Sequence, residues 1–309
     1  MPSQTEQTFR DYTPEQGKSY AQNRLDYHPA LYSTIIAHHT STGGQLNSLI
    51  DLGTGPGNVA QNLSKHFTKT TGLDPSQGMI ETARSLADPD ALAQGKIAFE
   101  VSTAEEIGRN LTPPIADGSV DLIVAATAAH WFDMPKFWQR AARVLKPGGS
   151  VAIWGSGNLR VDRRTPNAAA IDARVEEFEE EMRPFFLPGN LMTRGLYKEL
   201  GLPWTVEPAV KGFEEGSFLR KEWDGVDEFL AKGQPEVDLG KFEKMIGTMS
   251  PVTRWREAHP EAVGTDEDIV RRFRRDVERL LREAGQEEGK ETIRGSAQGF
   301  LLIVKREKQ

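Results

Sequence analysis

The 309-residue sequence contains no cysteine, which excludes disulfide bonds, thiolate catalysis and zinc sites built on cysteine. It also lacks a long apolar run: the longest, Phe300–Val304, has five residues, whereas a membrane span needs roughly 18. The N-terminus is polar and has no apolar core of a signal peptide, so we expect a cytoplasmic protein without a membrane partner. A net charge of −7 argues against a general nucleic-acid binder.

Metal ligation is not indicated either. Of the six histidines, only His38 and His39 are adjacent, and the others show no metal-ligand spacing. We therefore expect no metal site.

The sequence does contain an alternation of strand and helix signals between residues 46 and 156. Extended segments lie at residues 49–52, 70–74, 97–101, 120–125 and 150–154, and helical spacing lies at residues 59–67, 76–84 and 136–145. Alternating strands and helices with short connections predict a doubly wound, mostly parallel α/β sheet that is covered by helices on both faces.

The rest of the chain surrounds this core, which spans residues 46–157. Residues 1–45 precede it and are expected to form an N-terminal helical flap. Residues 158–290 are irregular and helical by turns, and residues 291–309 contain a strong strand signal at Ser296–Val304. Because a late strand returns to the sheet, we expect residues 158–290 to form an inserted helical cap with late sheet elements.

Local signals within the cap are weaker. Pro184 and Pro188 interrupt its first part. The expected elements are a helix end at Tyr197–Leu202, a strand at Thr205–Phe213, and helices at 224–232, 238–249 and 266–284.

The segment Asp51-Leu52-Gly53-Thr54-Gly55-Pro56-Gly57 lies between a predicted strand and a predicted helix. Glycines there let the backbone turn sharply and approach a ligand, with the helix N-terminus pointing at it. Gly55-x-Gly57-x-x-Ala60 also fits the permissive dinucleotide pattern. However, Pro56 removes an N–H that a pyrophosphate would need, and the carboxylate of Asp51 would repel a pyrophosphate but attract an amino group.

Asp74 adds a further requirement. It ends the second predicted strand, 21 positions after Gly53, where an acid accepts hydrogen bonds from both ribose hydroxyls of a nucleoside. The site thus suits a ribose, a positive group near Asp51 and no diphosphate, and S-adenosylmethionine meets these three conditions. A tight turn without a ligand and an NAD(P) site are the alternatives.

Five segments follow one another in this core: DLGTGPG, GLDPSQGMIETAR, STAEEIG, VDLIVAATAAHWFD and RVLKPGGSVAIW. In this order they resemble the class I S-adenosylmethionine-dependent methyltransferase family. The resemblance covers residues 46–156 and implies a Rossmann-like seven-stranded doubly wound sheet whose last strand is antiparallel. Phe300–Val304 suits that last strand.

The resemblance also implies which residues bind the cofactor. By this resemblance, the methionine part of the cofactor is bound by Asp51, Gly53 and Gly55, and the ribose is bound by Asp74. The residues implied near the adenine are Met79, Thr103 and Ala104, and the residue implied at the mouth of the fourth strand is Ala125.

Two further segments flank the core motifs. Tyr20-x-x-x-Arg24-x-x-Tyr27 precedes the core, and Ala129-His130-Trp131-Phe132-Asp133 follows the fourth strand. Both are similar to segments of the trans-aconitate methyltransferase group, especially its fungal branch, although Arg24-Leu25 replaces the usual Arg-Pro of that group. The resemblance implies a small polycarboxylate as acceptor, but the group includes members that act on other small metabolites.

Four of these residues are candidates for closing the site. Tyr20 and Arg24 lie four apart on one helix face, and the resemblance implies that they cover the cofactor, with Arg24 pairing its carboxylate. His130 and Trp131 follow the fourth strand, where an α/β sheet places its ligands. We expect Trp131 to form a wall of the substrate pocket and His130 to be a hydrogen-bond donor or general base. A surface helix, and a capping histidine beside a core tryptophan, are the alternatives.

Residues 271–282 contain six arginines against Asp276 and Glu278. Apolar residues at helical spacing, including Phe273 and Val277, share this segment. A solvated helix face is the favoured interpretation, and a site for an anionic substrate is the alternative.

The sequence therefore predicts an S-adenosylmethionine-dependent methyltransferase that acts on a small molecule. O-methylation of a carboxylate is favoured, because a carboxylate is ionised at pH 7 and needs no base. Methylation of a hydroxyl of a secondary metabolite, with His130 as base, is the alternative. A non-catalytic cofactor-binding regulator and an NAD(P) oxidoreductase are the alternatives from other classes. The oligomeric state is not indicated.

Overall fold

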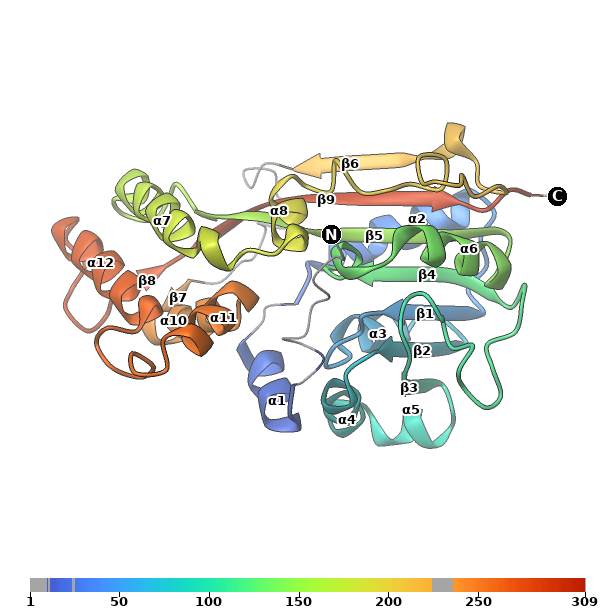
Figure 1. Cartoon of the computed structure of the whole chain (residues 1–309), viewed down its shortest axis with the longest axis horizontal. Helices are drawn as coiled ribbons and strands as arrows, with labels where there is room; N and C mark the ends of the chain where they lie inside the picture. The colour runs from blue at the N-terminus through green and yellow to red at the C-terminus, as the bar shows by residue number, and fades with distance from the viewer. Residues whose placement is uncertain (1–9, 11, 24–25, 224–235, 309) are drawn as a thin grey trace.

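The computed structural model describes residues 10, 12–23, 26–223 and 236–308. The strands among these residues form a seven-stranded sheet of order β3-β2-β1-β4-β5-β9-β6 and a two-stranded sheet of β7 and β8 (Figure 1). The strands of the large sheet are β1 (Ser48–Leu52), β2 (Lys69–Asp74), β3 (Ile97–Val101), β4 (Val120–Ala126), β5 (Leu145–Val161), β6 (Leu219–Trp223) and β9 (Gly295–Lys305).

The direction of the strands confirms the predicted topology. Strands β1 to β5 pair in parallel, and β9 enters antiparallel between β5 and β6. The central strands are nearly continuous apolar runs because both faces of the sheet are covered. The sheet is thus a Rossmann-like, doubly wound sheet with an antiparallel terminal strand.

Helices cover the two faces of the sheet, as alternation along the strands requires. The flanking helices are α2 (Pro29–Ser41), α3 (Asn58–Leu63), α4 (Gln77–Leu86), α5 (Pro89–Ala93) and α6 (Met134–Val144). Leu49 and Leu122 pack with α2 and α3 on one face, whereas Ile50 and Ile123 pack with α6 on the other. Period-two alternation in the strands thus separates two apolar cores.

Beyond the large sheet, β5 and β9 continue together toward the cap. Arg160 and Val161 still pair with Ser296 and Gly295, after an irregularity between Ser156 and Leu159. The elements of the cap are α7 (Ala168–Met182), η2 (Arg183–Phe185), α8 (Pro188–Arg194), β7 (Val237–Asp238), α10 (Leu239–Gly247), α11 (Ser250–Ala258), α12 (Ile269–Glu283) and β8 (Thr292–Ile293). Figure 1 shows most of them gathered at the end of the β5–β9 ribbon.

A separate apolar cluster holds the cap together. The stripe of α12 contributes Phe273 and Val277, both fully buried. The Phe273 ring stacks on Phe178 of α7, with 4.3 Å between ring centroids. Burying a side chain of this size contributes roughly 1.5–3 kcal/mol. The helices predicted at 238–249 and 266–284 are therefore confirmed as α10 and α12.

Two local predictions for the cap are wrong. Residues 197–202 are turn and irregular structure, because α8 already ends at Arg194 and the backbone of Leu196 and Tyr197 is left-handed (φ 52° and 53°). Thr205–Phe213 is mostly irregular, since Pro208 interrupts it and removes a ladder donor, and only Phe213 forms an isolated antiparallel bridge, to Arg306. The sheet strand is instead β6, whose Arg-Lys-Glu centre suits an edge strand but hides its signal. The predicted helix at 224–232 lies outside the described residues.

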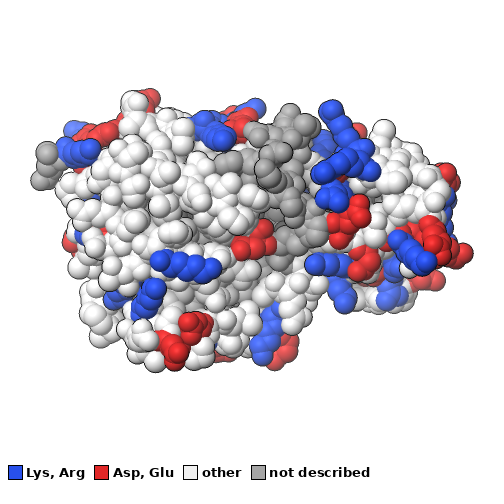
Figure 2. Space-filling view, turned by 180° about the vertical axis from the view of Figure 1, so that it is seen from behind, with Lys and Arg blue, Asp and Glu red and all other residues white. Residues whose placement is uncertain are grey.

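Charges of both signs are interspersed on the face shown in Figure 2, with many of them toward the cap. In the described part of the chain, every helix is too short or too polar to cross a membrane. The same residues contain no cluster of three or more His, Asp or Glu side chains that could hold a metal ion.

Candidate functional site

The loop Gly53–Gly57 joins β1 to α3 at the carboxyl edge of the sheet. A Cβ on Gly53 would lie 2.6 Å from the Cβ of Ala128, and one on Gly57 would lie 2.8 Å from the Phe99 ring. A Cβ on Gly55 (φ +53°) would meet no atom within 4 Å among the described residues. Gly53 and Gly57 therefore permit close packing, whereas Gly55 leaves an open cradle above the loop.

Asp51 lies beneath this loop. Its side chain is buried, and Oδ2 accepts a 2.6 Å hydrogen bond from the Thr54 hydroxyl. Burial raises the pKa of the Asp51 carboxyl to about 7, against the opposing effect of that hydrogen bond. From the sequence we expect Asp51 to contact an amino group of the ligand. In the structure its carboxyl instead stabilises the loop through the hydrogen bond from Thr54.

Asp74 ties the loop to the next helix. Oδ2 accepts a 2.9 Å hydrogen bond from the Gly55 N–H, and Oδ1 accepts one of 2.9 Å from the Ser76 N–H. Burial raises the pKa of the Asp74 carboxyl to about 6, although these two hydrogen bonds favour its ionised form. Among the described residues, neither Asp51 nor Asp74 forms an ion pair, although the charge of Arg10 also favours the ionised form of Asp74. Two buried acids beside an open cradle favour a cationic ligand that also carries hydroxyl groups.

The predicted adenine neighbours lie around the same edge. Met79 is buried in the first turn of α4, where its N–H donates to the capping Ser76 hydroxyl over 3.3 Å. Thr103 and Ala104 follow β3, and Thr103 is half-buried while Ala104 is 8% exposed. These positions remain predictions for the adenine.

Ala125 is the residue expected at the mouth of β4. Ala125 is fully buried in the core, so its methyl group is not accessible to a ligand in this structure. Ala126 and Thr127 are the half-buried residues there. The Thr127 hydroxyl lies 2.9 Å from the Tyr27 hydroxyl, which belongs to the N-terminal segment. Tyr27 is thus brought to the site edge by a contact that its sequence position did not reveal.

The N-terminal helix α1 (Pro14–Asn23) packs on α4 beside the loop (Figure 1). A Cβ on Gly17 would lie 2.5 Å from the Thr82 hydroxyl, so only glycine allows this approach. Tyr20 is half-buried and lines a cavity of about 420 Å³ that α1 shares with α10 and α11. The helix α1 of the flap therefore lies against α4, the helix that carries Met79. Arg24 lies outside the described residues.

His130 and Trp131 form the short helix η1 (Ala129–Trp131) after β4. The His130 Nδ1 is hydrogen-bonded to the hydroxyl of Tyr197, which also accepts the His130 backbone N–H over 3.2 Å. Burial lowers the pKa of the His130 imidazole to about 3, so the ring is neutral at pH 7. Gly189 of α8 packs against both rings, since a Cβ there would lie 2.7 Å from Trp131 and 2.9 Å from His130. Sequence reasoning missed Tyr197, which is 67 positions away from its partner.

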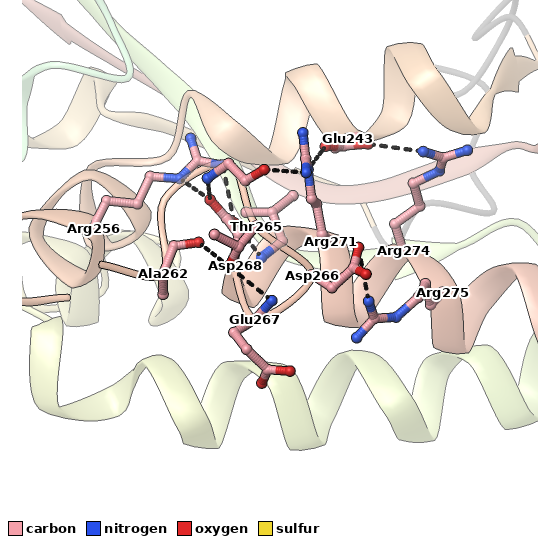
Figure 3. Close-up of polar contacts among 12 residues, drawn as sticks. Glu243, Arg256, Ala262, Thr265, Asp266, Glu267, Asp268, Arg271, Arg274 and Arg275 are labelled. Carbon is pink, nitrogen blue, oxygen red and sulfur yellow. Dashed lines mark hydrogen bonds and ion pairs between the residues drawn. The ribbon is translucent and has the colours of Figure 1, made fainter. Parts of the chain in front are cut away.

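The arginines of α12 are held by acidic side chains, as Figure 3 shows for part of the network. The ion pairs are Arg271–Glu243, Arg272–Glu181, Arg274–Glu243, Arg275–Asp266, Arg279–Glu283 and Arg282–Glu291. Arg256 of α11 likewise bonds to Asp268, whose carboxylate caps α12 by accepting the Val270 N–H over 3.0 Å. These ion pairs favour a structural role for this helix face over the alternative of an anion site.

Comparison with known proteins assigns the core. Residues 50–153 match a family described as a methyltransferase domain. The chain contains a methyltransferase domain. S-adenosylmethionine is the cofactor of this domain, and the site fits it: the cradle at Gly55 is open, and two buried acids suit a cation that carries a ribose.

Individual relatives agree with this assignment. A Dictyostelium discoideum protein assigned as a methyltransferase is 35% identical over 52% of this chain and 54% of its own length. A Saccharomyces cerevisiae protein assigned as an S-adenosylmethionine-dependent methyltransferase is 28% identical over 44% of this chain and 43% of its own. The chain thus spans about half the length of the curated relatives that it matches.

A solved structure supports the fold over a longer range. A protein of Anaeromyxobacter dehalogenans, described as a type II methyltransferase, superposes with a TM-score of 0.58 at 23% identity. The match covers 92% of this chain and 97% of that one. The likeness therefore includes the cap as well as the methyltransferase domain, at the level of the fold.

Proposed function

We propose that this protein transfers a methyl group from S-adenosylmethionine to a carboxylate oxygen of a small molecule, as the resemblance to the trans-aconitate group implies. The choice of a carboxylate as acceptor is based on the protonation state of the His130 imidazole. A neutral imidazole whose pKa is lowered to about 3 is a poor base at pH 7. A carboxylate is ionised at that pH and needs no base.

The residues of the cradle have separate tasks in this proposal. When bound, S-adenosylmethionine supplies a methyl group activated by its positively charged sulfur. Asp74 accepts the ribose hydroxyls, Gly55 leaves space for the cofactor, and Asp51 keeps the loop in place. The fold contributes mainly by aligning the two reactants and by excluding water.

The acceptor would lie at the carboxyl end of β4, beside Gly155 of β5. Thr127 and His130 follow β4, and a Cβ on Gly155 of β5 would lie 3.2 Å from the Thr127 hydroxyl. Gly155 therefore packs closely against the Thr127 hydroxyl and the Phe300 ring, where a larger residue would crowd both. Trp131 packs against His130 with 4.4 Å between ring centroids and would form the wall of the pocket.

A panel of acceptors tests this proposal. The protein is incubated with S-adenosylmethionine and either small di- and tricarboxylic acids or phenols and alcohols, and S-adenosylhomocysteine formation is measured. We expect turnover with a carboxylic acid and a product that mild alkali hydrolyses. Turnover with phenols or alcohols alone would contradict the carboxylate and support the hydroxyl alternative. Tight cofactor binding without turnover across a broad metabolite extract would favour the regulator.

A further inference from the structure

We infer that Tyr197 is a positioning residue that fixes His130 as a hydrogen-bond donor toward the acceptor. The inference rests on the proposed function for the identity of the acceptor. The arrangement of the two side chains can be tested independently of any reaction.

The tyrosine hydroxyl contacts His130 at two atoms. It accepts the backbone N–H of His130 over 3.2 Å and is hydrogen-bonded to Nδ1 of the same residue. Both contacts place the imidazole relative to its own backbone. The ring therefore has little freedom to turn about its side-chain bonds.

Counting protons assigns the tautomer. If Nδ1 carried the proton, the Tyr197 hydroxyl would accept twice, and its own proton would lack a partner among the described residues. If the hydroxyl donates to Nδ1, then Nδ1, the hydroxyl proton and the His130 backbone N–H all have partners, as buried groups require. The proton of the neutral ring then resides on Nε2.

The Nε2 atom is the part of the ring that a ligand can reach. In the described structure it has no hydrogen-bond partner, and it is not among the fully buried unpartnered atoms, so it retains some exposed surface. An N–H at this point can donate to a carboxylate or carbonyl oxygen, but it cannot accept a proton. The pair thus specifies an acceptor that presents an oxygen lone pair.

The backbone around Tyr197 is built to hold it there. Tyr197 is 1% exposed, and its ring lies 4.5 Å from that of Phe300, between centroids. Tyr197 and Leu196 both have left-handed φ, which non-glycine residues adopt at a cost, and the Tyr197 N–H donates to Met192 O over 3.0 Å. Leu196 fills the space at Gly157, where a Cβ would lie 2.6 Å from Leu196 Cδ2. This turn follows α8 and places the Tyr197 hydroxyl beside His130, which follows β4.

Nitrogen NMR of ¹⁵N-histidine-labelled protein tests the inference. His130 signals are assigned by their loss in His130→Gln. We expect wild type to show one neutral tautomer with the proton on Nε2, unchanged from about pH 5.5 to 8.5. In Tyr197→Phe we expect a mixture of tautomers, and a kcat on the active carboxylic acid that is lower by up to about tenfold.

Tyr32→Phe is the matched control, because it removes another tyrosine hydroxyl, one that donates to Asp26 over 2.8 Å. It should leave the His130 signals and kcat unchanged. A proton on Nδ1 in wild type, titration of the ring near neutral pH, or unchanged His130 signals in Tyr197→Phe would overturn the inference. The wild-type spectrum decides the tautomer even where Tyr197→Phe fails to fold. Failure to find any acceptor would leave the spectra valid and would count against the proposed function instead.

Discussion

Replacing Gly55 by alanine distinguishes two possible roles of this glycine in the cofactor loop: leaving space for the ligand, and allowing a left-handed backbone. The added Cβ would meet no atom of the described protein within 4 Å, so the substitution causes no clash in the unliganded state. The backbone at φ +53° remains unfavourable for alanine and should cost roughly 1–2 kcal/mol of the free energy of unfolding. The methyl group would, however, occupy the cradle proposed for S-adenosylmethionine.

Gly95 offers a matched control. It lies in an exposed turn after α5, has φ +66°, and a Cβ there would also meet no atom within 4 Å. Gly95→Ala and Gly55→Ala should therefore lose similar stability in urea unfolding. Only Gly55→Ala should lose cofactor affinity, by about 1–3 kcal/mol for an overpacked contact, or about 5- to 150-fold.

Calorimetric titration with S-adenosylhomocysteine measures this difference. Equal affinities of wild type, Gly95→Ala and Gly55→Ala would refute the reasoning, because the space above Gly55 would then hold no part of the ligand. A loss of affinity in Gly95→Ala as well would show that reduced stability, and not occupied space, weakens binding.

Three further predictions concern the acids and the histidine. Asp74→Ala should lower stability as well as cofactor affinity, because each orphaned backbone N–H at Gly55 and Ser76 costs about 1–3 kcal/mol; a wild-type melting temperature would contradict this. The raised pKa values of Asp51 (about 7) and Asp74 (about 6) favour the protonated acids in the fold, so stability from these groups is full below about pH 4 and declines as the pH rises through 6 to 7. Ionisation over the same range should tighten binding of the cationic S-adenosylmethionine, and calorimetry showing affinity that is flat or falls from pH 5.5 to 8 would contradict it. His130→Gln keeps a donor and should retain kcat on a carboxylic acid within about tenfold of wild type, whereas a general base would lose about 10² to 10⁴ in both His130→Gln and His130→Ala.

The core of the fold could be predicted because its signals are local. Apolar strands and capped helices alternate, and the Ser76 hydroxyl accepts the Met79 N–H as the predicted N-cap. The edge strand β6 could not be recognised, since Arg220, Lys221 and Glu222 read as a surface loop. Its place in the sheet depends on pairing with β9, about 80 residues later, and such long-range pairing leaves little trace in sequence.

In the candidate site, too, the local features could be predicted from the sequence and the long-range contacts could not. The cradle and Asp74 follow from the order of strand, glycines and acid. The burial of Asp51 under its own loop, and the contacts of Tyr27 with Thr127 and of Tyr197 with His130, depend on tertiary packing. In the arginine-rich segment, sequence showed the positive charges, and only the structure showed the acids from other helices that neutralise them.

Transfer of a labelled methyl group tests the central claim most directly. The protein is incubated with S-adenosylmethionine carrying a trideuteromethyl group and with the carboxylic acid selected from the acceptor panel, and the product is analysed by mass spectrometry before and after mild alkali. The account predicts one deuterated methyl group on the acid, released as labelled methanol by alkali. Label that stays on the product after alkali would show an ether or a C- or N-methyl group, and it would contradict carboxylate methylation.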